Sequence, residues 1–125
     1  MKKFIVPEDA IILDIKTEVV EDMEGLLIST NKGIVKIAID DGQQCCEDFG
    51  ALFFETPDDT EKFIGSKIIQ VESIFIAGDE EGGEVQLKIT TSKGVLQYAI
   101  YNQHNGYYAH STLIQVFDDK EEGRL

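Results

Sequence analysis

Cysteine is scarce in this sequence. Only two of its 125 residues are cysteine, and they are adjacent, at Cys45 and Cys46. Neighbouring cysteines seldom bridge each other, because the ring that would close between them is strained. We therefore expect no disulfide framework, and a reducing cytoplasm is the natural compartment. A chain of this length can fold as one domain without such cross-links.

Basic residues are also few. The sequence holds 11 Lys and Arg against 24 Asp and Glu, which gives a net charge of -13. A field of this sign repels nucleic-acid phosphates, so we expect no direct binding of DNA or RNA. It suits a protein partner with a basic surface, or mimicry of a polyanion. A solvated acidic surface that serves no partner is the simpler explanation of the charge, and it stays open.

Long apolar runs are absent. No segment approaches the roughly 18 apolar residues that a membrane-spanning helix needs. Near the N-terminus, Pro7, Glu8 and Asp9 interrupt the chain before the apolar region of a signal peptide could form. We therefore expect neither a signal peptide nor a membrane segment.

Short apolar segments that alternate with polar residues fill most of the chain, which indicates a β fold. One short connecting helix is predicted near 57–64, because Thr56 suits the N-cap, Pro57 the first helical position and Gly65 the end. The predicted class is mainly β (α+β), with about eight antiparallel strands in a single domain, residues 1–125. The expected strands are 11–20, 26–30, 34–39, 51–55, 67–76, 85–91, 95–101 and 112–117.

The sequence contains an internal match. Residues 30–39 and 91–100 are identical at five positions: Thr, Lys, Gly, Ala and Ile. We interpret the chain as two pseudo-repeated halves, about 11–55 and 67–117, which form a sandwich or a barrel-like sheet. A chance match between two similar hairpins is the alternative. The acidic tail at 118–125 is expected to fray.

Duplication makes detailed predictions about matching positions. Gly33 and Gly94 should share one turn geometry, and Ala38 and Ala99 should be matching small residues. The alignment also gives Gln44-Cys45-Cys46-Glu47 the place that Asn105-Gly106-Tyr107-Tyr108 holds in the second half. The two segments are therefore candidates for two parts of one site, or for two structural corners.

Residues 102–110 contain two His, two Asn, one Gly and two Tyr, an unusual density of side chains able to recognise a ligand. Loops carried on a rigid sheet are where binding function concentrates. Aromatic rings can stack on a ligand, and amides and imidazoles can hydrogen-bond to it. The candidate binding residues are Asn102, His104, Asn105, Tyr107, Tyr108, His110, Cys45, Cys46 and Glu47.

Several of the same residues could in principle bind a metal ion or take part in catalysis. Cys45, Cys46, His104 and His110 offer zinc donors, but adjacent cysteines cannot easily both bind one tetrahedral ion. A Cys-His-acid set with Glu47 can be drawn, yet nothing in the sequence activates a thiolate or supplies a phosphate-cradling loop. We expect no metal, no cofactor and no enzymatic activity.

A combination of motifs resembles a domain of unknown function that is common in bacteriophage genomes. It comprises Cys45-Cys46-Glu47 after a strand, the Ile-Gly-Ser-Lys segment at 64–67, and the closure at 105–108. In that family the closure usually reads Ser-Asn-Gly-Tyr-Tyr-Ser-Glu, so His104 and His110 depart from it. The resemblance spans about 11–116. It implies a small phage or prophage protein, and it carries no established activity.

Together these observations predict a non-catalytic binding protein that acts on a host or defence factor in the bacterial cytoplasm. The alternative is a protein that binds or sequesters a small molecule of the nucleotide type. A homo-oligomer is compatible with either hypothesis.

Overall fold

The structure of the chain, a computed structural model, describes residues 2–20, 23–40, 48–53, 57–77, 81–104 and 111–124. These residues form ten β-strands and one short helix, so the prediction of a mainly β fold is confirmed. In chain order the elements are β1 (Lys2–Phe4), β2 (Ile12–Val20), β3 (Met23–Thr30), β4 (Gly33–Asp40), β5 (Asp48–Phe53), η1 (Pro57–Phe63), β6 (Ile68–Ala77), β7 (Glu81–Thr91), β8 (Gly94–His104), β9 (Ser111–Val116) and β10 (Asp119–Arg124).

Two of these strands, β1 and β10, are additional to the eight that the sequence predicts. The acidic tail does not fray over the described residues, because β10 pairs with β9 from Asp119, opposite Val116, to Arg124, opposite Ser111. Its residues show no alternation of apolar and polar side chains. Strand formation here follows from pairing with a neighbour rather than from local preference, so the sequence pattern gives no sign of it.

The helix η1 lies where the sequence places it, but it is a 3-10 helix. Two hydrogen bonds with the tighter i to i+3 spacing follow its last residues: Ile64 N donates to Glu61 O at 3.1 Å, and Ser66 N donates to Phe63 O at 3.0 Å. Gly65 then adopts a φ of 85°, which ends the helix. Short helices of this kind are common as connectors, which is the role of η1 between β5 and β6.

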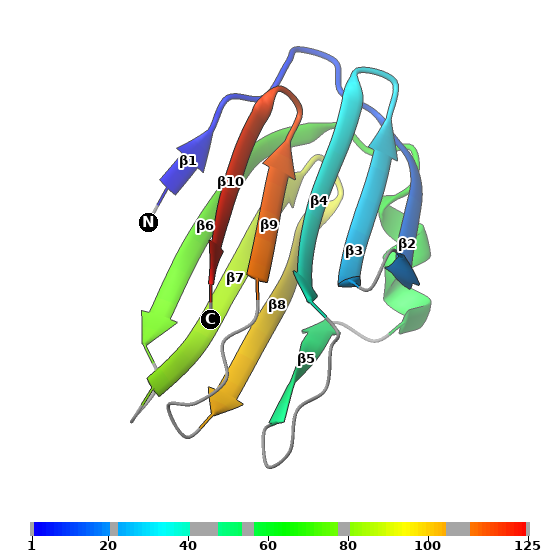
Figure 1. Cartoon of the computed structure of the whole chain (residues 1–125). Coiled ribbons are helices and arrows are strands. Elements are labelled where there is room, and N and C mark those ends of the chain that lie inside the picture. The colour runs from blue at the N-terminus through cyan, green and yellow to red at the C-terminus, as the bar shows by residue number, and fades with distance from the viewer. Residues whose placement is uncertain are drawn as a thin grey trace.

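The strands form two antiparallel sheets of five strands each, packed face to face as an open sandwich (Figure 1). The sheet orders are β1-β6-β7-β8-β5 and β10-β9-β4-β3-β2. Neither sheet closes on itself, so of the two predicted architectures the sandwich is correct and the barrel-like sheet is not. The edge strands are β1 and β5 in one sheet and β10 and β2 in the other.

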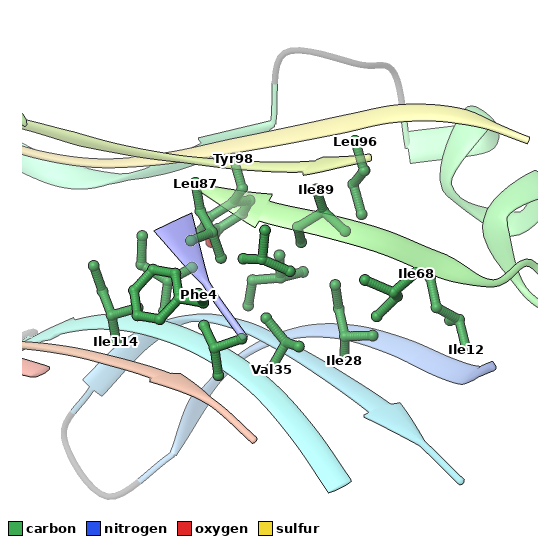
Figure 2. Close-up of a cluster of buried hydrophobic side chains, with 14 of the residues drawn as sticks. Phe4, Ile12, Ile28, Val35, Ile68, Leu87, Ile89, Leu96, Tyr98 and Ile114 are labelled. Atoms are coloured by element: carbon green, nitrogen blue, oxygen red, sulfur yellow. The ribbon is translucent and has the colours of Figure 1, made fainter. Parts of the chain in front are cut away.

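The core lies between the sheets (Figure 2). Successive side chains of a strand point to opposite faces, so the buried side chains of the central strands come mostly from every second residue. One sheet contributes Val71, Leu87, Ile89, Leu96 and Ile100, and the other contributes Leu26, Ile28, Val35, Ile37 and Ile39. Phe4 of β1 and Phe63 of η1 complete the core from its margins.

The chain order of the strands is the same in the two halves. The meander β2-β3-β4 lies in one sheet and the meander β6-β7-β8 in the other, and the next strand of each half joins the opposite sheet. Leu52 of β5 lies opposite Ala99, and Leu113 of β9 lies opposite Ala38. Leu52 matches Leu113, and Ala38 matches Ala99, at the same offset of 61 positions (113 minus 52, and 99 minus 38). β5 and β9 therefore pair with their neighbours in the same register.

Local irregularities correspond as well. The register between β2 and β3 shifts between Ile12 and Asp14, and that between β6 and β7 shifts between Ile68 and Gln70. The two shifts are 56 positions apart (68 minus 12). As predicted, Gly33 and Gly94 share a turn geometry, with φ values of 143° and 136°.

The halves meet through reciprocal hydrogen bonds. Ile12 N donates to Ser66 O, and Ile68 N donates to Ala10 O, both at 2.9 Å. Residues 10, 11 and 12 correspond to residues 66, 67 and 68 at an offset of 56 positions, so exchanging the halves converts each of these bonds into the other. The β-bridge between Ile11 and Lys67 lies between the two bonds. The sandwich therefore has an approximate twofold axis at this junction.

Candidate functional site

Both sequence motifs leave the sandwich at the same end. β4 ends at Asp40 and β5 begins at Asp48, so the cysteine pair belongs to the connection between these strands. β8 ends at His104 and β9 begins at Ser111, so the second motif, residues 105–108, belongs to the connection between these two strands. β5 pairs with β8 in one sheet and β4 pairs with β9 in the other, so these strand ends are neighbours in two pairs. We call this the motif end; it is the lower end in Figure 1.

Two of the nine predicted site residues have a described backbone. Asn102 lies in β8 opposite Phe49 of β5, and His104 lies opposite Glu81 of β7. The structure thus brings the ends of both motif segments together, while a shared site between them stays a prediction. The other seven predicted residues lie outside the described part of the chain: Asn105, Tyr107, Tyr108, His110, Cys45, Cys46 and Glu47.

Acidic residues gather at the motif end. The strand ends there include Glu24, Asp40, Asp48 and Glu81, and one basic residue, Arg124, which lies opposite Ser111. The segments that connect the strands at this end hold a further six Asp and Glu and no Lys or Arg; they are residues 21–22, 41–47, 78–80 and 105–110. Negative charge concentrated in this way attracts a positively charged partner over several ångströms of solvent.

Lysines gather at the opposite end of the sandwich. Lys32 and Lys93 hold matching places in the β3-β4 and β7-β8 turns. Lys93 Nζ donates to the carbonyl of Ile64 at 3.4 Å, and Lys67 Nζ lies 3.3 Å from an oxygen of Asp9. Acidic residues such as Asp9 and Asp118 lie at this end as well, so it carries both signs of charge, whereas the connecting segments at the motif end carry acids alone.

A groove of about 570 Å³ opens between the two sheets, on the side where β10 and β9 lie across from β6 and β7 (Figure 1). Its apolar lining is Phe75, Val85 and Ile114. The other lining residues are Ser73, Thr112, Lys120, Glu121, Glu122 and Gly123. Apolar and polar side chains therefore both line the groove.

One lysine joins the two sheets beside this groove. Lys2 Nζ lies 2.8 Å from a carboxylate oxygen of Glu121 and 3.2 Å from one of Asp119, so β1 is tied to β10. The hydrogen bond to Glu121 is the main cause that raises the pKa of Lys2, and Asp119 adds to it. The same ammonium group lies 4.8 Å from the centre of the Phe4 ring. These contacts hold the two sheet edges together.

The sequence analysis missed this groove. Residues 120–123, which form the β10 side of the groove, were not recognised as part of a strand. Phe75 was placed correctly in a strand, but a strand of such apolar character is normally buried on at least one face. No local signal distinguishes a buried phenylalanine from one that lines an open groove.

Residues 8–114 match the model of a protein family described as a domain of unknown function, DUF7448. The chain belongs to this family. No curated protein matches the chain. No solved structure matches it either.

The DUF7448 match runs from the segment before β2 into β9, and so includes both sequence motifs. β1 and β10 lie outside the match. The groove is therefore built partly from residues within the DUF7448 match and partly from residues that flank it.

Two further observations concern the described part of this DUF7448 protein. No helix there is long and apolar enough to cross a membrane. Among the same residues, no three His, Cys, Asp or Glu side chains gather as the ligands of a metal ion would.

Proposed function

We propose that this protein is a non-catalytic binding protein whose partner is a protein with a basic surface. The observation that carries the proposal is the concentration of acidic residues at the motif end, where the two candidate binding segments also emerge. In this proposal the chain is a phage or prophage accessory protein, and the partner is a host or defence factor in the bacterial cytoplasm.

Electrostatics gives the motif end a direct advantage in finding such a partner. Complementary charge mainly accelerates association and excludes wrong partners, while buried aromatic contacts supply most of the affinity. Acidic strand ends around a segment with two tyrosines combine both contributions. A uniformly solvated acidic surface would need no such concentration at one end.

A pull-down from bacterial lysate at low and at high salt tests the proposal. The test variant replaces Glu24, Asp40 and Asp48 by Gln, Asn and Asn. A matched control replaces Glu8, Glu61 and Asp118, exposed acids away from the motif end, by the corresponding amides. Both variants change the net charge by the same amount.

We expect the unmodified protein and the control to retain one partner at low salt, and high salt to weaken its capture. The variant at the motif end should lose most of that capture, because surface attraction is screened and local. Failure to capture a partner at either salt would count heavily against this function. Equal loss in both variants would reduce the role of the motif end to general acidity.

A small ligand of the nucleotide type is the competing proposal, and the groove is where it would bind. Glu121 and Glu122 outnumber Lys120 among the residues that line the groove, which disfavours an anion. A thermal-shift screen decides the point, since a ligand at 100 times its dissociation constant stabilises a protein by about 2.7 kcal/mol. We expect no shift with nucleotides.

A further inference from the structure

The first strand of each half has one side turned away from its meander, and the two sides are closed in different ways. At the offset of 56 positions, Ile15 of β2 corresponds to Val71 of β6. Val71 pairs with Phe4 of β1, so a strand closes the edge of β6 at this position. Among the described strands, none pairs with the corresponding side of β2. The helix η1 contacts both β2 and β8, so it closes the core between the two sheets and offers β2 no strand.

The backbone of Ile15 faces this edge. Ile12 turns its amide and carbonyl away from β3, where they bond to Ser66 O at 2.9 Å and Gly65 N at 2.8 Å. Backbone groups alternate between the two sides of a strand, and the register shift between Ile12 and Asp14 inserts one extra residue. Ile15 is therefore in phase with Ile12, and its amide points to the place where a neighbouring strand would bond.

The side chain of Asp14 takes up that amide. Ile15 N donates to Asp14 Oδ1 at 3.0 Å. The other carboxylate oxygen, Oδ2, lies 3.6 Å from Lys16 Nζ, so both oxygens have a partner. An added strand would have to displace the carboxylate from Ile15. Charged side chains and bulges on an edge strand are means by which β proteins prevent pairing between edges.

We propose that the Asp14 carboxylate closes the β2 edge in the place where β1 closes the β6 edge, and that without it the edge pairs with β2 of a second copy. The counterpart of Asp14 is Gln70, whose amide donates to the carboxylate of Glu72. β1 covers the edge beside Gln70 by pairing with Val71. A neighbouring strand and a side-chain cap thus serve the same purpose at corresponding positions.

A second copy of the chain is the occupant that β2 itself favours. Two exposed edges of the same strand can pair antiparallel about a twofold axis. Centred on Ile15, such a pairing sets position 14 of one copy opposite Lys16 of the other, so no like charges lie directly opposite each other. The net charge of -13 opposes the approach of two copies. Association is therefore measured at about 1 M salt, where the screening length is about 3 Å.

Two substitutions of Asp14 separate its hydrogen bond from its charge. Asp14→Asn keeps a side-chain oxygen that can accept from Ile15 N, Asp14→Val removes it, and both change the net charge equally. The Asp14 side chain is 46% exposed, so the fold should tolerate either change. Gln70→Val is a matched control at the corresponding position of β6, where β1 covers the edge. Sedimentation velocity measures self-association, and hydrogen exchange measures the amides of residues 14–17.

We expect Asp14→Val to lower the dissociation constant of self-association at least about tenfold relative to Asp14→Asn, which should behave like the unmodified protein. The amides within residues 14–17 of Asp14→Val should exchange more slowly as the protein concentration rises. At high dilution, the Ile15 amide should exchange faster in Asp14→Val than in Asp14→Asn, because its acceptor is gone. Gln70→Val should not associate.

An Asp14→Val protein that stays monomeric at high salt would overturn the proposal. Equal association of Asp14→Val and Asp14→Asn would also overturn it, because the charge and not the hydrogen bond would then be the cause. The same holds for Gln70→Val, whose association would assign the effect to any added apolar side chain. Association that leaves residues 14–17 unprotected would place the contact elsewhere, and association of the unmodified protein through these residues would show that Asp14 does not close the edge.

Discussion

The two halves of the sandwich agree in their hydrogen-bonded interior and differ at their edges. Residues 9–53 and 65–114 share strand order, registers, the shifted register of the first strand and the turn of the meander. The halves differ beside their first strands. β1 (residues 2–4) pairs with β6, the first strand of the second half. The residues that would match β1 at the offset of 56 positions are 58–60, and they lie in the helix η1. We propose that a duplicated unit supplied the interior and that each half acquired its own edge.

This comparison shows where a new binding surface can arise in such a fold. Interior strands are constrained by pairing on both sides and by a close-packed core. An edge strand is constrained by pairing on one side only. The groove beside Phe75 lies at such an edge, and β10, which lines it, lies outside the two corresponding sets of strands.

The largest expected effect tests the equivalence of the halves in the core. Ile12 and Ile68 hold matching positions beside the junction and are 0% and 1% exposed. Replacing either by Ala removes buried methyl groups and leaves a cavity, which should cost about 2–5 kcal/mol of unfolding free energy. Denaturant unfolding of the two variants should give similar losses. Losses that differ by more than about 2 kcal/mol, the spread expected from local relaxation, would show that the halves are not energetically equivalent.

The second prediction concerns a position at which the halves differ. Gly25 lies opposite Ala38, and its counterpart Gln86 lies opposite Ala99. A Cβ atom at Gly25 would lie 2.7 Å from the Cα of Ala38, too close without a backbone shift. Gly25→Ala should therefore cost about 1–3 kcal/mol or slightly more, as overpacking does.

Gln86→Ala is the control for this change, since its position already accommodates a side chain. We expect it to alter the unfolding free energy by less than about 1 kcal/mol. If Gly25→Ala proves as mild as the control, the close approach of β3 and β4 is not a constraint on the first half.

The third prediction concerns the matching turns. Thr30 Oγ1 donates to Gly33 O at 2.7 Å, and Thr91 Oγ1 donates to Gly94 O at 2.8 Å. Thr→Val at either position removes this bond and should cost about 1 kcal/mol. The loss should be larger for Thr91, which is buried, than for the partly exposed Thr30. Urea unfolding of the two variants measures the difference, and the reverse order would contradict the burial argument.

The interior strands could be predicted from the sequence, whereas the edge strands β1 and β10 could not. Alternating apolar residues and the Thr-x-Lys-Gly turns predict the meanders, because these signals are local. Strand β1 escapes prediction because it pairs with β6, far along the chain, and β10 escapes because its residues show no alternation of apolar and polar side chains. The groove also escapes prediction, because the sequence around Phe75 resembles that of a core strand although its side chain is exposed. At the candidate site, the chain order and the pairing of β5 with β8 suffice to bring the ends of the two motif segments together.

The smallest expected effect concerns Lys2 of β1, a strand that is present beside the second half only. Its pKa is raised above the ordinary value by the hydrogen bond to Glu121 and by Asp119. A group with a raised pKa in the folded state stabilises the fold fully below its unfolded pKa of about 10.4, and the contribution disappears as pH rises through the folded value. Lys2→Met should therefore remove a small, salt-sensitive part of the stability near neutral pH and little of it at strongly alkaline pH. Hydrogen exchange of the β1 and β10 amides, compared with those of β2, measures this local effect. Equal acceleration in β2 would show that Lys2 supports the whole sandwich and not only the edge that carries the groove.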